Sequence, residues 1–247
     1  MSGHSHYATI KRQKSANDAA KGKVFSKYAR AIQIAVKTGG SPDPNSNYKL
    51  RMTIEAARGE NMPKENIERA ISRAAGDSAN IEEVLYEGFG PVGVSVIVEV
   101  ATDNRNRTAQ EMKNFFEKGG GSLAGPGAVS YNFEQKGIVF TEKGENSENT
   151  MLKLIDAGAE DVEEVDDGFE VYVAPTQTAA VKEKLEGMGV KVVSAKLIMK
   201  PKNMQTVSTK EEANKVLSWL EKLEEHEDVQ KVFVNLDIPQ ELVAELS

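Results

Sequence analysis

Apolar residues recur at helical spacing through the first third of the chain and divide it into three short helical segments. The first segment ends at Gly39-Gly40, where glycine favours the end of a helix. The third begins near Pro63, whose missing amide proton is tolerated in a first turn. The apolar faces of the three segments are Val24, Tyr28, Ile32 and Ala35; Leu50, Ile54 and Ala57; and Ile67, Ala70, Ile71 and Ala74. The pattern predicts a small three-helix bundle, preceded by a tail over residues 1–14.

After Gly76 the pattern changes to short β-branched runs that alternate with helical stretches. Two β-α-β units are predicted, one on each side of a central segment. The first consists of strand Val94–Val100, helix Asp103–Lys118, the glycine-rich turn Gly119–Gly127 and strand Val129–Phe133. The second consists of strand Thr206–Ser208, helix Glu211–Leu223 and strand Val229–Leu236. The stretch Tyr86–Gly93 is interpreted as a loop that enters the first strand.

The central segment carries a complete set of six elements. Asp166-Asp167-Gly168 is typical of a hairpin turn, because Asp-Gly tolerates positive φ. The elements are strand Gly137–Thr141, helix Thr150–Ala157, strands Asp161–Val165 and Glu170–Val173, helix Ala179–Gly187 and strand Val190–Met199. The order βαββαβ is that of a ferredoxin-like fold.

The predicted fold class is therefore a multidomain α/β (α+β) protein with an N-terminal three-helix bundle and two ferredoxin-like βαββαβ domains. If the two flanking β-α-β units pair, they also form a βαββαβ set, and one domain is inserted in the other. The expected domains are residues 1–78, residues 79–134 with 204–247, and the inserted residues 135–203. A single larger sheet is the alternative.

Charge is distributed unevenly along the chain, although the net charge is only −7. Residues 1–75 carry 14 Lys/Arg and 6 Asp/Glu, whereas the remainder carries 17 and 32. This asymmetry indicates a basic binding arm on an acidic body, since a local excess of cations attracts phosphate. The chain has no cysteine, which excludes disulfides and thiolate metal sites. It has neither an apolar run long enough to span a membrane nor the apolar core of a signal peptide, so we expect a cytoplasmic protein.

Several strings of residues, all in the same order, resemble the YebC family. The resemblance is dense over residues 1–133 and extends, more thinly, to the end of the chain. The strings are Gly3-His4-Ser5, Ile10-Lys11, Lys21-Gly22-Lys23-Val24-Phe25-Ser26-Lys27, Gly39-Gly40, Asn61-Met62-Pro63, Ile67-Glu68-Arg69-Ala70-Ile71, Tyr86-Glu87-Gly88-Phe89-Gly90-Pro91, Asp103-Asn104-Arg105-Asn106-Arg107-Thr108 and Gly120-Gly121 with Leu123, Gly127, Val129, Tyr131 and Phe133. Tyr7, Val92, Ser122 and Ala124 depart from the family pattern, in which Trp, Gly, Asn and Gly are usual.

The resemblance implies a helical N-terminal domain followed by two α/β domains, one inserted into the other. It also implies a regulator of gene expression, because members of the family are known as probable transcriptional regulatory proteins that act on DNA. Mitochondrial relatives are known as translational activators, so the alternative is a translation factor that binds the ribosome through its RNA. No membrane partner is expected. The sequence leaves the oligomeric state undetermined, with a monomer as the default expectation.

The candidate nucleic-acid-binding residues are basic or aromatic and lie mainly in the tail and the first helix. Cations there attract the phosphate backbone, and Tyr7 suits stacking on an unpaired base. The set is Tyr7, Lys11, Arg12, Lys14, Lys21, Lys23, Lys27 and Arg30, with Arg105 and Arg107 at the start of the helix that follows Asp103. The two arginines oppose the helix dipole, which indicates a partner, either phosphate or a carboxylate of another domain. For the first helix, a solvated basic face is the alternative.

No pattern indicates catalysis, a metal or a cofactor. The stretch Gly119–Gly127 lacks the Gly-Lys-Ser/Thr ending of a phosphate-binding loop and precedes a strand instead of a helix. The three histidines, His4, His6 and His226, form no zinc-binding motif, and no serine lies in a nucleophile elbow. We therefore expect a protein that is not an enzyme and has neither catalytic residues nor a cofactor.

Overall fold

Three helices of the N-terminal region pack on one another around a small apolar core. The computed structural model describes residues 20–76, 81–144, 146–165 and 167–246. The helices are α2 (Ala20–Gly39), α3 (Tyr48–Gly59) and α4 (Lys64–Ala75). The core consists of Ile32, Ala35, Val36, Leu50, Ile54, Ala57, Met62, Ile67, Ala70 and Ala74. The predicted three-helix bundle is confirmed, since its apolar faces form this core.

The loop between α2 and α3 is organised by the buried side chain of Asn47. Its Oδ1 accepts a hydrogen bond from the amide of Leu50 at 3.0 Å and so caps α3. Its Nδ2 donates to the carbonyl oxygens of Ala35 at 2.9 Å and Ser41 at 2.7 Å. A Cβ at Gly39 would lie only 2.2 Å from the same side chain, so glycine is required there by close approach. One asparagine therefore joins the end of α2 to the start of α3.

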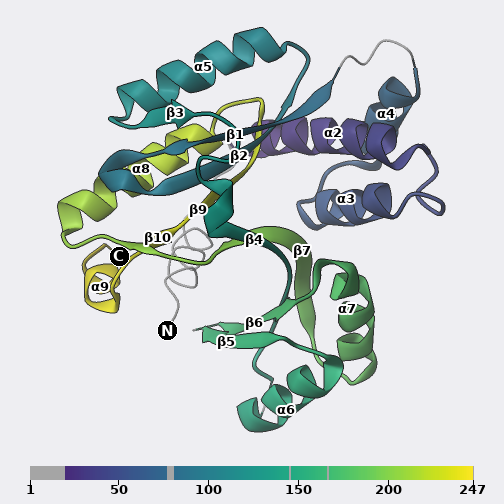
Figure 1. Ribbon diagram of the computed structural model, residues 1–247. Helices are drawn as coiled ribbons and strands as arrows, with labels where there is room; N and C mark the ends of the chain where they lie inside the picture. Colours follow the sequence, from purple (N-terminus) through teal and green to yellow (C-terminus); the bar gives the residue numbers. More distant parts are fainter. Residues whose placement is uncertain (1–19, 77–80, 145, 166, 247) are drawn as a thin grey trace. The chain divides into compact units, whose positions relative to one another are not determined.

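The first four-stranded sheet has the strand order β3-β1-β2-β9. Its strands and the two helices associated with them are β1 (Glu82–Phe89), β2 (Ser95–Thr102), α5 (Arg105–Lys118), β3 (Ser122–Ala124), α8 (Lys210–Glu224) and β9 (Val229–Val234). The helices α5 and α8 lie on one face of it (Figure 1). Trp219 of α8 contacts the rings of Phe115 and Phe116, with centroid separations of 5.5 and 5.1 Å.

Three predictions for this sheet need correction. The stretch Tyr86–Gly93, interpreted as a loop, holds the end of β1 and a short 3-10 helix over Pro91–Gly93. The predicted strand Val129–Phe133 is a 3-10 turn over Ser130–Asn132, and the third strand is Ser122–Ala124 inside the glycine-rich turn. The element order is thus ββαβαβ, which differs from the βαββαβ order expected for this domain. The burial pattern of β1 is irregular, so alternation did not reveal that strand.

The second four-stranded sheet is antiparallel and follows the order β5-β6-β4-β7, as in a ferredoxin-like fold. Its elements are β4 (Phe133–Thr141), α6 (Ser147–Ala157), β5 (Asp161–Val165), β6 (Gly168–Val173), α7 (Thr178–Gly187) and β7 (Val192–Pro201). The helices α6 and α7 cover one face of this sheet. The core between them includes Val139, Leu154, Phe169, Val171, Val173, Val181 and Leu185. The six predicted elements of the central segment are confirmed.

A small parallel sheet pairs β8 (Gln205–Thr206) with β10 (Leu236–Asp237), and α9 (Gln240–Leu246) follows. The predicted strand Val229–Leu236 is therefore divided into β9 and β10 at Asn235. Its amide Nδ2 donates to the carbonyl oxygen of Asn203 at 3.1 Å. Asn132 also donates to that carbonyl, at 2.9 Å, so three asparagines join the points where the chain enters and leaves the second sheet.

The fold divides into two units. One comprises Val129–Ala213 with residues 233–246, and the other comprises residues 20–128 with Asn214–Val232. The mixed fold class, a helical N-terminal region followed by sheet domains, is confirmed. The boundaries proposed at residues 78, 134 and 203 stay predictions. None of the helices in the described ranges is long and apolar enough to cross a membrane.

Candidate nucleic-acid interface

One face of α2 carries a row of the predicted basic residues. Lys23, Lys27 and Arg30 follow one another at spacings of four and three, which places them on the same side of a helix. Lys21 lies in the first turn of α2. The tail residues of the prediction, Tyr7, Lys11, Arg12 and Lys14, lie outside the described residues.

The row on α2 faces an acidic turn between α8 and β9, within the same unit of the fold. Lys23 Nζ lies 3.9 Å from a carboxylate oxygen of Glu225, and Lys27 donates to the backbone carbonyl of Glu224. Both members of the Lys23 pair are more than half exposed, so that pair contributes little to stability. The predicted cations are therefore not all free for a ligand, because the protein supplies some of their partners itself.

Asp228 forms the centre of this contact. Its carboxylate, only 3% exposed, accepts hydrogen bonds from the guanidinium of Arg30, from Arg107 Nη2 at 3.0 Å and from the hydroxyl of Thr108 at 2.6 Å. Arg30 also donates to the carbonyl of Ala101 at 3.2 Å, and that residue's amide donates to the carbonyl of Asp228 at 2.8 Å. Asp228 thus ties α2, α5 and the end of β2 to one another.

The electrostatics of Asp228 follow from these partners. Burial favours the neutral carboxyl and by itself raises the pKa. The hydrogen bonds from Thr108, Arg30 and Arg107 favour the charged form and outweigh burial, so the pKa of Asp228 lies below its ordinary value. The hydrogen bond to Asp228 in turn raises the pKa of Arg107. The carboxylate is therefore charged at neutral pH, as its two arginine partners require.

The two arginines of α5 differ in their surroundings. Asn104 caps the helix, accepting from the amide of Arg107 at 3.1 Å. The side chain of Arg107 pairs with Asp103 at 3.0 Å and with Asp228, so of the two partners considered from the sequence, phosphate and a carboxylate, the fold provides the carboxylate. Arg105 is exposed, and its carbonyl accepts from the hydroxyl of Tyr86 at 3.4 Å.

A group of potential metal ligands adjoins this network. One ligand atom from each of Glu111, His226 and Asp228 lies within 4.8 Å of the other two. However, the carboxylate of Asp228 is taken up by two guanidinium groups, whose positive charge opposes a cation there. Nδ1 of His226 accepts from the amide of Asp228 at 3.2 Å, and its Nε2 is 3.2 Å from Glu111. The donor set is thus already used by hydrogen bonds, and we assign no metal to it.

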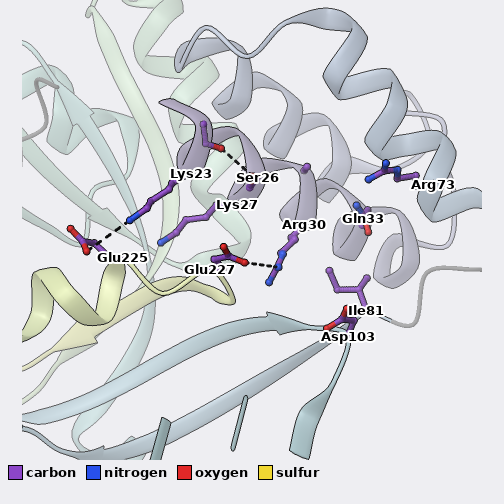
Figure 2. Close-up of a pocket in the computed structure, with 12 residues that line it drawn as sticks. Lys23, Ser26, Lys27, Arg30, Gln33, Arg73, Ile81, Asp103, Glu225 and Glu227 are labelled. Carbon is purple, nitrogen blue, oxygen red and sulfur yellow. Dashed lines mark hydrogen bonds and ion pairs between the residues drawn. The ribbon is translucent and has the colours of Figure 1, made fainter. Parts of the chain in front are cut away.

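A hollow of about 490 Å³ opens beside the row on α2 (Figure 2). It is lined by Gly22, Lys23, Ser26, Lys27, Ala29, Arg30, Gln33, Arg73, Ile81, Asp103, Glu225 and Glu227. Four of these side chains are cationic and three are acidic. The sequence did not single out Arg73, Gln33 or Asp228: Asp228 ends an acidic run that is typical of a solvated surface, whereas Gln33 lies between Ile32 and Ile34 in an apolar part of its helix.

Two family models match almost the whole chain. The model described as the N-terminal domain of TACO1/YebC proteins matches residues 5–77, and that of the TACO1/YebC second and third domain matches residues 81–236. The chain belongs to the TACO1/YebC family. The resemblance noted from its sequence motifs is thereby confirmed.

Relatives within the TACO1/YebC family match over their full length. A protein of Syntrophomonas wolfei, named a probable transcriptional regulatory protein, is 43% identical over the whole of both chains. A protein of Chloroflexus aggregans with the same name is 48% identical over 98% of each chain. Among solved structures, a conserved hypothetical protein of Aquifex aeolicus is 44% identical and superposes with a TM-score of 0.82, covering 90% of this chain and 93% of that one.

Proposed function

We propose that this TACO1/YebC protein is a nucleic-acid-binding regulator of gene expression that contacts DNA through its N-terminal bundle. The observation that carries the proposal is the charge of the bundle. Residues 20–76 contain 11 Lys/Arg against 5 Asp/Glu, in a chain whose net charge is −7. Such a local surplus attracts the phosphate backbone and releases its counterions. The names of the relatives, probable transcriptional regulatory proteins, agree with this role.

Ribosomal RNA is the second candidate, and the position of Arg30 favours it. α2 buries one face in the bundle core, while Arg30 on another face is held by Asp228 and Ala101. The helix therefore lacks a free arginine for bidentate contact with a guanine edge in a major groove. Its lysines are point charges that suit phosphate better than base edges. Contacts of this kind also suit folded RNA, which is recognised largely by shape.

Binding is tested by anisotropy titrations with a labelled DNA duplex and a labelled RNA hairpin of equal length. The test variant lacks residues 1–14 and carries Lys21→Ala and Lys23→Ala; Lys27 is kept because it supports the fold. We expect weaker binding and a slope of log K against log salt that falls by about 0.9 for each lost phosphate contact on DNA. A control with Lys113→Ala and Lys118→Ala, both exposed on α5, should bind like the wild type.

Two assays, one of them on cell lysate, distinguish DNA from ribosomal RNA as the target of the protein. Sedimentation on a sucrose gradient with and without nuclease is compared with a shift assay on promoter DNA in excess competitor. Comigration with ribosomal particles and no competitor-resistant shift would contradict a transcriptional role. A sequence-dependent shift without comigration would contradict the ribosomal one.

A further inference from the structure

Two polar side chains from different helices face the 490 Å³ hollow without a partner of their own. Gln33 extends the row Lys23, Lys27 and Arg30 by another three residues along α2, and Arg73 comes from the last turn of α4. Arg73 is exposed and forms no ion pair or hydrogen bond with any described residue, and the Gln33 amide is likewise unpartnered across the described ranges. Figure 2 shows both side chains among those that line the hollow.

The other charged groups of the hollow are already paired. Lys23 is matched by Glu225, Arg30 by Glu227 and Asp228, and Asp103 by Arg107, while Lys27 donates to the backbone carbonyl of Glu224. Arg73 is then a cationic side chain of the lining without a partner among the described residues, and the Gln33 amide lines the same hollow. A guanidinium presents a rigid fork of donors that matches the oxygens of a phosphate. The unmatched donors therefore define a site for an oxyanion.

We propose that this hollow binds a phosphodiester group of a nucleic-acid backbone, with Arg73 as the charged donor and Gln33 as the neutral one. The inference rests on the proposed function and adds α4 to its contact surface. It makes Arg73 a binding residue, whereas Arg30 and Arg107 keep α2 and α5 in place through Asp228. The arginines of this region thus serve two separate purposes, phosphate binding at Arg73 and helix packing at Arg30 and Arg107.

The acidic residues at the rim of the hollow do not prevent phosphate binding at Arg73. Glu225 and Glu227 are 62% and 82% exposed, and their cationic partners lie 3.9 and 3.8 Å away. Exposed pairs of this kind are weak, so neither glutamate is held firmly against an incoming phosphate. Asp228 is different, because its buried carboxylate remains bonded to Arg30, Arg107 and Thr108.

The decisive experiment compares Arg73→Ala with Arg58→Ala in the full-length protein, using the DNA duplex and the RNA hairpin as probes. Arg58 is an exposed arginine of α3 that also lacks a partner among the described residues but does not line the hollow, so the two variants lose the same charge. We expect Arg73→Ala to bind about tenfold more weakly at low salt, with a salt slope smaller by about one, on at least one of the probes. Arg58→Ala should stay within about twofold of the wild type, since it loses only long-range attraction.

Two further variants separate geometry from charge. Arg73→Lys keeps the salt slope but loses part of the affinity, because an ammonium lacks the planar fork. Gln33→Ala weakens binding without changing the slope, because no charge is removed. Equal losses in Arg73→Ala and Arg58→Ala would overturn the site while leaving the proposed function intact. If the wild type binds neither probe, the proposed function fails and the site fails with it. Circular dichroism of each variant checks that the helices are retained.

Discussion

Arg30 of α2 donates a hydrogen bond to the buried carboxylate of Asp228, 198 residues further along the chain. The same carboxylate accepts from Arg107, so one negative charge is shared by two guanidinium groups on α2 and α5. Asp228 is the final residue of an acidic run that begins at Glu224, yet it is the buried one. A residue that resembles solvated surface in the sequence is therefore the residue that holds the basic helix in place.

Replacing Asp228 with alanine is expected to destabilise the protein. It leaves Arg30 and Arg107 without their shared counterion in a partly buried setting, which lowers the free energy of unfolding by about 3 kcal/mol. Urea denaturation followed by circular dichroism measures the change. Asp103→Ala is the matched control, because Asp103 is 69% exposed and its pair with Arg107 contributes less than about 1 kcal/mol. An equal fall in the free energy of unfolding of the two variants would contradict the central position of Asp228.

Acidification is expected to remove the contribution of Asp228 to the stability of the folded protein. Its pKa in the folded protein is lowered, so the unfolded chain, with a pKa near ~3.9, binds the proton first. The stabilisation is therefore complete above about pH 5 and is lost as pH falls through 3.9 towards the folded pKa. The difference in melting temperature between the wild type and Asp228→Asn should shrink over this interval. A difference that stays constant down to acid pH would contradict the assignment.

Val92 is expected to be a strained position. Its φ of 61° and ψ of 14° lie in the left-handed region, which a β-branched residue adopts at a cost. Val92→Gly should raise the free energy of unfolding by about 1 kcal/mol, since glycine adopts this conformation freely. Val193→Gly, in an exposed position of β7, should instead lower it, because strand glycine is unfavourable. A fall in stability of Val92→Gly would show that side-chain contacts outweigh the strain.

Gly119 is expected to tolerate no side chain. A Cβ there would lie 2.0 Å from Nε1 of Trp219, the single tryptophan of the chain. Gly119→Ala should therefore displace the indole from Phe115 and Phe116 and cost about 2 kcal/mol, with a shift of the tryptophan emission to longer wavelength. Gly125→Ala is the control, because nothing lies within 4 Å of the Cβ it would add. Unchanged emission in Gly119→Ala would contradict the close approach.

The second sheet is expected to fold without the rest of the chain. The core formed by β4, β6, α6 and α7 is contained within residues 139–190, and Asn132 bonds the backbone of Asn203 at the two ends. A fragment of residues 129–203 should unfold cooperatively in urea. Proton NMR with the narrow dispersion of a disordered chain would contradict both this expectation and the predicted inserted domain of residues 135–203.

The sequence alone determined most of the elements that local spacing governs. The apolar repeat from Val24 to Ala35 predicted α2, and the six elements of the central segment followed from periodicity and one Asp-Gly turn. These signals are local because a helix or a strand repeats over a few residues. Where the signal was weak, the prediction was wrong: β1 lacks alternation, and the run Val129–Phe133 turned out to be a 3-10 turn that leads into β4.

Only the tertiary structure decided which charged residues are partners. The spacing of Lys23, Lys27 and Arg30 in the sequence places them on one face of a helix, but it contains no information about their partners. Whether such cations pair with phosphate or with carboxylate depends on which distant segment folds against them. For Arg30 that segment is the turn between α8 and β9, which contains Asp228. Arg73 and Gln33 became a candidate site for the same reason: two side chains 40 positions apart share one hollow only after the bundle has packed.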